Sequence, residues 1–440
     1  MTEPLPPSSK QASNGQDALA VVQRLRQHGY VAYFAGGCVR DMLLGIAPKD
    51  YDVATDAPPQ RVREIFSNTQ AVGAAFGVIL VRHGKSTVEV ATFRSDARYE
   101  DGRRPTSVTF TTPEEDAKRR DFTINGLFFD PIDETVIDYI GGQQDLRDRV
   151  LRAIGNPNER FEEDHLRLMR AVRFAARFTL KIEPATHWAI GHHADVLRRI
   201  SPERIAEELR LMLAPASRNI AWPMLWEYGL LHVILRMLPG LPKTKPMFDP
   251  QRSILLALLP GESASFATAL AAGVLCYQWQ ITGGDLLPLL QKQQVQKVVH
   301  SVRLTLKISN SEMDEMSEVL HSPAVLLGAA EPGVAQMKRF LAGAHAGGAR
   351  QILTALRTVG LHPSRCDWLA NQLDELSKGD YAPIPFVTGD DLTAAGYRPG
   401  PVFKPVLEQV YDAQLEDRVK TKQQAIALAR TILDNGAGSA

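Results

Sequence analysis

The sequence predicts an α+β domain at the N-terminus followed by an all-α remainder. Up to about Asn156, short runs of β-branched and aromatic residues alternate with amphipathic helical segments. Beyond that point nearly every segment repeats its apolar residues with the 3.6-residue period of a helix. A mixed pattern followed by a helical one predicts a strand-containing head joined to a long helical part.

The first elements expected in the head are a helix, a strand, a second helix and a second strand. Residues 1–17 are polar and rich in Pro and Ser, so we expect a disordered leader. The expected elements are a helix over 18–28, a strand over 30–35, a helix that Gly36-Gly37 opens and Gly45 ends, and a strand over 49–53.

The rest of the head is expected to contain a β-hairpin and a charged loop. Two β-prone segments, 78–82 and 87–94, flank Gly84 and predict paired strands. The polar loop 95–107 follows, and it is either a solvated loop or, beside a metal site, a lid that moves with each nucleotide. The remaining elements expected are a helix over 58–66, a strand from Val108, a helix after Pro113 and an edge strand at 135–142.

Changes of pattern and Pro/Gly-rich breakers divide the chain into five parts. They are the leader (1–17), the head (18–155), a helical neck (156–215), a helical body (216–345) and a helical tail (346–440).

The overall composition excludes several classes of protein. The 440 residues carry 50 basic and 50 acidic side chains, so a polyanion must be met by local clusters of charge. Three widely spaced cysteines, Cys38, Cys276 and Cys366, fit neither a disulfide framework nor a zinc site and indicate a reducing cytoplasm. Because no apolar run reaches about 18 residues, we expect no membrane-spanning helix.

Residues 36–53 combine a glycine-opened helix with two aspartates. Glycines at a strand-to-helix junction let the backbone approach an anion, and the helix N-terminus offers free N–H groups to phosphate. Arg40 adds a charged donor in the first turn. On a strand, Asp50 and Asp52 would project from one face. Two carboxylates beside a phosphate cradle predict a site for a Mg²⁺-bound triphosphate.

A second motif covers residues 163–177 and predicts a helix that reads a nucleobase. An aspartate and an arginine three residues apart, Asp164 and Arg167, present an acceptor beside a donor fork. Cytosine and adenine show the complementary amine and ring nitrogen, whereas uracil and guanine show the reverse order, so the pair would discriminate between them. Arg170 and Arg173 follow along the helix and would offset the negative charge of the triphosphate. The alternative is an amphipathic helix with a solvated basic face.

The triplet Arg119-Arg120-Asp121 is a third candidate, in which an arginine reaches phosphates and the nearby Asn125 orients its neighbours. A third metal-binding carboxylate is left open between Glu89 and Asp121, and a solvent-facing role for the strand residue Glu89 is an equal alternative.

These motifs together resemble the class II tRNA nucleotidyltransferases, the CCA-adding enzymes, whose head is shared by bacterial poly(A) polymerases. The resemblance covers about residues 30–180 and recurs in 345–435. It rests on GGCVRDMLLG, KDYDVAT, VEVATFR, YEDGRRPTSVTF, RRDFTINGL and EDHLRLMRAVRFAAR in this order.

The resemblance implies a polymerase-β-like mixed sheet and template-independent addition of CCA to tRNA 3′ ends. In that family the paired aspartates are catalytic and bind two Mg²⁺ ions, which maps onto Asp50 and Asp52. The residues that would bind the CTP or ATP substrate are Gly37, Arg40, Arg120, Asp164, Arg167, Arg170 and Arg173. The implied partner is the 3′ end and acceptor/T arm of tRNA; no protein partner is implied.

Several alternatives stay open at this point. Poly(A) polymerases tend to carry a basic segment where this chain has GAAFGVILV, which favours tRNA, but an A-only enzyme is harder to exclude. Two other classes are a non-catalytic RNA-binding protein and a small-molecule nucleotidyltransferase. His192-His193 lacks ligand partners at a metal-site spacing, so we expect no second phosphatase activity. The basic residues that would face tRNA are Arg198, Arg199, Arg204, Lys404, Arg418, Lys420 and Lys422.

Overall fold

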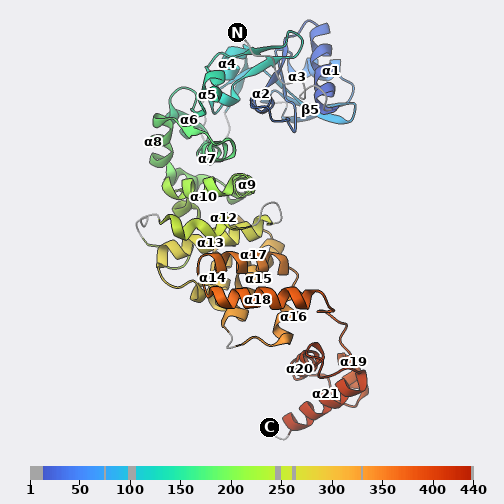
Figure 1. Cartoon of the computed structure of the whole chain (residues 1–440). Helices are drawn as coiled ribbons and strands as arrows, with labels where there is room; N and C mark the ends of the chain where they lie inside the picture. The colour runs from blue at the N-terminus through green and yellow to red at the C-terminus, as the bar shows by residue number, and fades with distance from the viewer. Residues whose placement is uncertain are drawn as a thin grey trace. The chain divides into compact units, whose positions relative to one another are not determined.

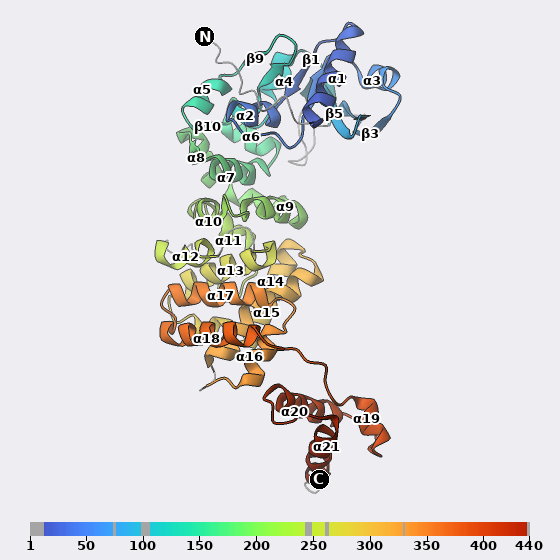
Figure 2. The same cartoon turned by 45° about the vertical axis from the view of Figure 1, so that its right-hand side comes forward.

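The computed structural model of the chain describes residues 13–73, 76–97, 106–242, 249–259, 264–328 and 331–437. These residues group into two compact units. Unit 1 contains the described residues up to Met212 together with Pro223–Ile234, and unit 2 contains Leu213–Trp222 and the described residues from Leu235 onward. Figures 1 and 2 show the elements of each unit from two directions.

Unit 1 is built on a mixed sheet. Within the described residues, seven strands form it in the order β3-β4-β5-β2-β1-β8-β9. β2 and β5 are parallel, and the other neighbours are antiparallel. The strands are β1 (Ala32–Ala35), β2 (Val53–Thr55), β3 (Thr69–Gly73), β4 (Val78–His83), β5 (Ser86–Thr92), β8 (Phe128–Asp130) and β9 (Thr135–Ile137).

The two faces of this sheet are covered by different elements. Helix α1 (Ser13–Gln27) packs along β1, β2 and β5, and α3 (Pro59–Ile65) packs on β4 and β5 beside it (Figure 2). On the opposite face Ala35, Phe93 and Phe128 form an apolar cluster with Ala117 of α4, Pro113–Lys118. Alternate residues of a strand point to opposite faces, so each strand contributes to both cores.

Two predicted boundaries in the head are wrong. Helix α1 begins at Ser13, so the predicted leader, 1–17, contains its first turn. Asp17 accepts a hydrogen bond from Ser86 Oγ at 2.6 Å, which ties that turn to the β4–β5 hairpin and orders it. The strand predicted over 49–53 begins only at Val53, so both aspartates precede it.

The remaining elements of unit 1 surround the sheet and continue from it. A two-stranded sheet of β6 (Arg94–Asp96) and β7 (Val108–Phe110) flanks the predicted loop 95–107, whose residues 98–105 lie outside the described residues. Other elements are α2 (Gly37–Leu43), η3 (Thr123–Asn125), α5 (Gly142–Arg147), β10 (Val150–Leu151), α6 (Pro157–Glu163), α7 (Arg167–Phe178), β11 (Lys181–Ile182), α8 (Pro184–His192), η4 (Ala194–Arg199), α9 (Pro202–Met212) and α11 (Leu230–Ile234); α10 (Arg218–Glu227) follows α9.

The described residues of unit 2 form helices and no strand. Helix α15 packs against α13, α14 and α17, and α18 packs against α16 and α17. The last three helices share their own apolar cluster, which includes Leu392, Val406 and Ala425. The helices are η5 (Pro250–Ser253), α12 (Ile254–Ala257), α13 (Phe266–Thr282), η6 (Leu287–Leu290), α14 (Lys292–Leu306), α15 (Asn310–Gly328), α16 (Val334–Leu341), α17 (Ala346–Thr358), α18 (Pro363–Ser377), α19 (Gly389–Ala394), α20 (Phe403–Leu415) and α21 (Lys422–Ala437).

The predicted fold class, a mixed-sheet head followed by an all-α part, is confirmed. The finer division into neck, body and tail stays a prediction.

Candidate active site

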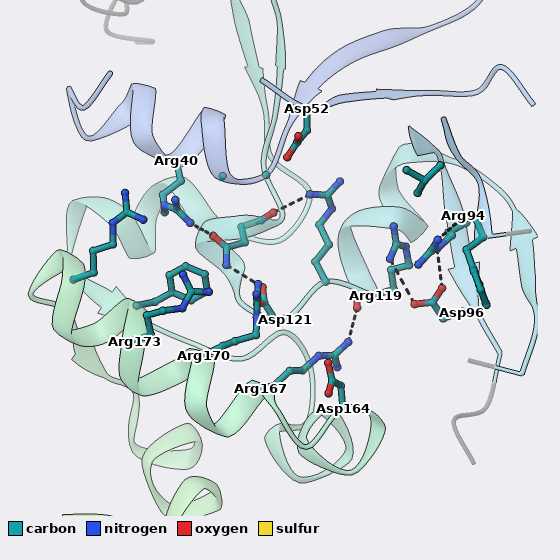
Figure 3. A pocket seen from close by; sticks show the side chains of 18 residues that line it. Arg40, Asp52, Arg94, Asp96, Arg119, Asp121, Asp164, Arg167, Arg170 and Arg173 are labelled. Carbon is teal, nitrogen blue, oxygen red and sulfur yellow. Dashed lines mark hydrogen bonds and ion pairs between the residues drawn. The ribbon is translucent and has the colours of Figure 1, made fainter. Parts of the chain in front are cut away.

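A cavity of about 730 Å³ opens in unit 1 between the sheet-bearing head and helix α7 (Figure 3). Its lining contains more arginines than aspartates, so its field attracts anions. The charged lining residues are Arg40, Arg94, Arg119, Arg120, Arg167, Arg170, Arg173, Arg177, Asp52, Asp96, Asp121 and Asp164.

The junction between β1 and α2 requires glycine. Gly36 has a φ of 71°, a left-handed value that favours glycine, and a Cβ there would lie 2.7 Å from Arg120 Nη1. Gly37 lines the cavity immediately after it. The predicted glycine cradle therefore lies at the site, although the strained position is Gly36 rather than Gly37.

Arg40 lies in the wall of the cavity with its donors engaged. Its Nε and Nη2 donate to Asp41, its Nη1 donates to Asn125 Oδ1 at 2.6 Å, and its guanidinium lies 4.4 Å from the centroid of the Phe178 ring. Burial lowers the pKa of Arg40 against the opposing effect of Asp41. These contacts connect α2 to α7.

The two aspartates of the predicted metal site are both exposed, and Asp52 lines the cavity. They are not strand residues, but Ala35 N donates to the Asp52 carbonyl at 2.9 Å and so fixes the backbone there. The parallel register Val53–Val90 brings Asp52 beside Glu89, the residue before Val90. Loss of hydration and the charges of Glu89 and Asp50 raise the pKa of Asp52 to about 6, against the opposing effect of Arg120.

This cluster of carboxylates fits a divalent cation. Neighbouring carboxylates repel each other, and a bound cation removes that repulsion. Within the described residues, no three or more His, Cys, Asp or Glu side chains gather closely enough to hold a metal ion by themselves. Mg²⁺ on nucleotide enzymes is held by one or two carboxylates together with substrate phosphates and water, which is the donor set that Asp50 and Asp52 offer.

Asp121 is occupied by an ion pair. Arg170 Nε and Nη2 lie 2.8 and 2.6 Å from its Oδ2, and Asn125 Nδ2 donates to its Oδ1 at 2.9 Å. Burial disfavours the charged carboxylate, but Arg170 and the Asn125 hydrogen bond outweigh it and hold the pKa of Asp121 at about 2. Asp121 therefore connects α7 to the head, and Glu89 is the better candidate for a third metal ligand.

Two further aspartates, Asp116 and Asp96, hold arginines that line the cavity. Asp116 accepts hydrogen bonds from Arg119 and Arg120, and Asp96 accepts one from Arg94 Nε at 3.0 Å. Arg94, Asp96 and Arg119 all line the cavity. Arg119 belongs to the RRD triplet already singled out in the sequence, whereas the charged segment RSD after β5 is the signal for Arg94 and Asp96.

Asp164 and Arg167 lie next to each other at the cavity, but not on one helix as predicted. Asp164 follows α6 with a φ of −135°, and α7 begins at Arg167. Their side chains have separate partners. Arg167 Nη1 donates to Glu163 at 2.6 Å, whereas Asp164 accepts from Arg204 Nη2 at 3.2 Å. Figure 3 shows both side chains across the pocket from Asp52.

Part of the basic face of α7 is buried rather than solvated. Arg167 and Arg173 are only 7% and 8% exposed. Arg173 Nε donates to Glu208 of α9 at 2.7 Å, and its guanidinium lies 4.2 Å from the centroid of the Phe174 ring. Burial lowers the pKa of Arg173, and Glu208 opposes that effect. The predicted phosphate-binding arginines thus line the cavity while held by carboxylates.

The histidine pair lies on α8 and just after it. His192 stacks on Trp188 with ring centroids 4.5 Å apart, and His193 Nε2 lies 2.9 Å from Asn158 Oδ1.

Family profiles match the chain in two places. The profile of the "Poly A polymerase head domain" matches residues 32–152, and that of the "Probable RNA and SrmB-binding site of polymerase A" matches residues 179–242. The CCA-adding enzyme of Geobacillus kaustophilus is 32% identical over 421 residues, which cover 93% of this chain and 95% of that enzyme.

The chain belongs to the family of CCA-adding enzymes and bacterial poly(A) polymerases. The predicted family and the predicted enzyme class, nucleotidyl transfer, are confirmed.

Other members of this family match more strongly over shorter stretches. The CCA-adding enzyme of Geobacillus stearothermophilus is 46% identical over 216 residues, which cover 49% of this chain and 53% of that enzyme. Poly(A) polymerase I of Salmonella typhi is 44% identical over 226 residues, which cover 49% of each. The chain therefore matches only about half the length of these two relatives.

A solved structure of this family covers the whole fold. The Bacillus stearothermophilus CCA-adding enzyme in complex with CTP aligns with a TM-score of 0.72 and 31% identity, over 97% of this chain and 100% of that one. None of the helices in the described part of the chain is long and apolar enough to cross a membrane.

Proposed function

We propose that this chain adds C, C and A to the 3′ ends of tRNA from CTP and ATP, without a nucleic-acid template. One observation carries the proposal: a single cationic cavity brings together Asp52, from the candidate metal site, and the base-reading candidates Asp164 and Arg167. The similarity to a CCA-adding enzyme over nearly its full length supports the same activity.

In the proposed mechanism, Asp50 and Asp52 would hold two Mg²⁺ ions, with Glu89 as the third candidate ligand. These ions would supply positive charge that favours ionisation of the RNA 3′-hydroxyl and departure of pyrophosphate. Overall, a bond from the 3′-oxygen to the α-phosphorus replaces the bond from that phosphorus to the bridging oxygen of pyrophosphate, and the hydroxyl proton passes to water. The neighbouring arginine Arg120 offsets the charge of the triphosphate.

Selection of the nucleotide is assigned to Asp164 and Arg167. The carboxylate accepts from the exocyclic amine of cytosine or adenine, and the guanidinium donates to the adjacent ring nitrogen. Uracil and guanine leave these groups unpaired, and an unpaired buried polar group is costly. Arg170 and Arg173 contribute positive charge near Asp164 and Arg167. They do not contribute free hydrogen-bond donors, because each is bound to a carboxylate.

The proposed acceptor is the acceptor/T arm of tRNA, bound through phosphates and shape. Exposed basic residues in the helical part are available for this: Arg198, Arg199, Lys404, Arg418, Lys420 and Lys422. We place the protein in the cytoplasm because its three cysteines are free and buried.

The second candidate is a poly(A) polymerase or A-adding tRNA enzyme, which the similarity of the head to poly(A) polymerase I of Salmonella typhi favours. This relative aligns over only half of either chain, so it leaves most of the helical part unaccounted for.

Incubation with tRNAs that lack A, CA or CCA, together with CTP, ATP or both, tests the proposal. We expect each tRNA to be completed with its missing nucleotides in fixed order and then to stop. Long adenylate tails on unrelated RNA, or incorporation of A alone, would favour the second candidate instead.

A further inference from the structure

The carboxylate of Asp164 is held by a residue distant in the sequence. Arg204 in the first turns of α9 places Nη2 3.2 Å from Oδ1 and 3.4 Å from Oδ2 of Asp164. Leu166 N donates to the same Oδ1 at 3.1 Å. Asp164 has an extended backbone between two helices, and these contacts from Arg204 and Leu166 set the orientation of its side chain.

Arg167, the second base-reading candidate, is held by contacts that do not involve Arg204. Its Nη1 donates to Glu163 at 2.6 Å and to the Arg160 carbonyl at 3.1 Å, and its Nη2 donates to the Arg119 carbonyl at 3.2 Å. Three hydrogen bonds define the plane of this guanidinium. The position of the acceptor relative to that plane therefore depends on Asp164 and on what holds it.

We propose that Arg204 is a specificity-determining positioning residue for nucleotide selection. This inference rests on the proposed function of Asp164 and Arg167. A carboxylate fixed beside the Arg167 donors penalises uracil and guanine because its lone pairs then meet oxygen or lack a donor. A carboxylate free to rotate toward water escapes that penalty, so the wrong base is rejected less strongly.

The site around Arg204 fits this role better than the tRNA-facing role predicted from the sequence. Its side chain is only 24% exposed and that of Asp164 is 20% exposed. A separate ion pair, Arg173 of α7 with Glu208 of α9, holds these two helices together without touching Asp164. Packing of α9 on α7 does not therefore depend on Arg204 alone, and the Arg204 contact is left to orient the carboxylate.

The two roles differ in what they change. If Arg204 bound tRNA phosphate, its loss would raise the KM for tRNA and lower the salt dependence of binding by about one phosphate contact. If Arg204 orients Asp164, its loss changes the ratio of kcat/KM between correct and incorrect nucleotides and leaves the KM for tRNA unchanged.

The experiment compares Arg204→Ala, Arg204→Lys and Arg61→Ala with the unmodified chain, on tRNA lacking CCA. Arg61 is the control because its ion pair with Glu64 is exposed on both sides and it is not among the residues proposed to bind nucleotide or tRNA. The measurement is kcat/KM for CTP, ATP, UTP and GTP, with thermal unfolding of each variant.

We expect Arg204→Ala to reduce the CTP-over-UTP and ATP-over-GTP ratios about tenfold, the value of one oriented hydrogen bond. Arg204→Lys should restore most of the discrimination, and Arg61→Ala should retain all of it.

Unchanged ratios in a folded Arg204→Ala variant, with or without a higher KM for tRNA, overturn the inference. If Arg204→Ala does not fold, the Arg204→Lys and Arg204→Gln variants test the inference. Only lysine preserves the positive charge, so nucleotide discrimination must be retained in Arg204→Lys and reduced in Arg204→Gln. Failure of the unmodified chain to add C and A would instead contradict the proposed function itself.

Discussion

Two arginine–aspartate pairs of the same length, one at the cavity of unit 1 and one on the surface of unit 2, differ in the burial of their carboxylates. In unit 1, Arg170 Nη2 lies 2.6 Å from Asp121, and in unit 2, Arg357 Nη2 lies 2.6 Å from Asp367. The carboxylate of Asp121 is 9% exposed, whereas that of Asp367 is 49% exposed. Burial of a charge is costly unless it is paired, so the buried pair must stay intact while the exposed one contributes little.

The same contrast recurs around each pair. Arg173–Glu208 is nearly buried on both sides, whereas Lys378–Glu375 is about 70% exposed on both sides. Fixed guanidinium groups near a nucleotide lose little conformational freedom when it binds, because the protein has already oriented them. Buried carboxylates therefore preorganise the cavity, and burial distinguishes aspartates that hold arginines from aspartates that remain available to a cation.

The largest expected effect is the loss of nucleotide addition when Asp50 or Asp52 is replaced. Asp52→Ala and Asp50→Ala should each reduce nucleotide addition by at least about a thousandfold, because the metal ions lose their protein ligands. Stability should change little, since both side chains are exposed. Steady-state incorporation assays with thermal unfolding measure both effects. Retained turnover in either variant would contradict the metal assignment.

The next effect is on the buried carboxylate. Asp121→Ala leaves the Arg170 guanidinium without its carboxylate and should lower the free energy of unfolding by about 3–5 kcal/mol. Chemical denaturation of the variant gives this value. A loss below about 1 kcal/mol would mean that water replaces the partner and that the pair is not effectively buried.

The free energy of unfolding should depend on pH through Asp121. The pKa of Asp121 is about 2 in the folded chain, below its ordinary value of 3.8. Its stabilising contribution is therefore present above pH ~4 and is lost as pH falls from there toward 2, by about 2 kcal/mol in all. Denaturation midpoints for the unmodified chain and Asp121→Asn should converge over that range. Parallel midpoints would show that Asp121 has no depressed pKa.

The smallest effect is predicted for the exposed pair. Asp367→Ala should change the free energy of unfolding by less than about 1 kcal/mol and leave nucleotide addition unchanged. It serves as the control for Asp121→Ala, because both remove the carboxylate from an Arg–Asp contact of equal length. A similar loss of free energy of unfolding in Asp367→Ala and Asp121→Ala would contradict the difference between the two ion pairs.

Much of the site could be predicted from short motifs because their chemistry depends on neighbours in the sequence. Gly36-Gly37 at a strand-to-helix junction, and Asp50 with Asp52, are local patterns, and the structure places these segments at one cavity or beside it. The prediction that both aspartate motifs lie within a regular strand or helix was wrong. Asp52 precedes its strand and Asp164 precedes its helix, since periodicity does not reveal where hydrogen bonding begins.

Partners across long stretches of sequence could not be predicted in the same way. Arg204 was expected to face tRNA, and Asp96 to lie in a loop that is either solvated or a lid, because an isolated charge in a sequence is indistinguishable from a surface charge. Only the packing of α9 on α7 brings Arg204 to Asp164, 40 positions earlier.

The amino-acid sequence was sufficient to predict the family, the order of a mixed head and a helical remainder, and the residue types proposed to bind metal and nucleotide. Periodicity encodes the order of elements, and the order of short motifs carries the resemblance to the family. Which carboxylate holds which arginine depends on the three-dimensional packing. Asp121 is bound to Arg170, whereas Asp52 lies beside Glu89 with a raised pKa. Burial and charge proximity arise from the fold, and these two quantities separate a structural aspartate from one that is available to a cation.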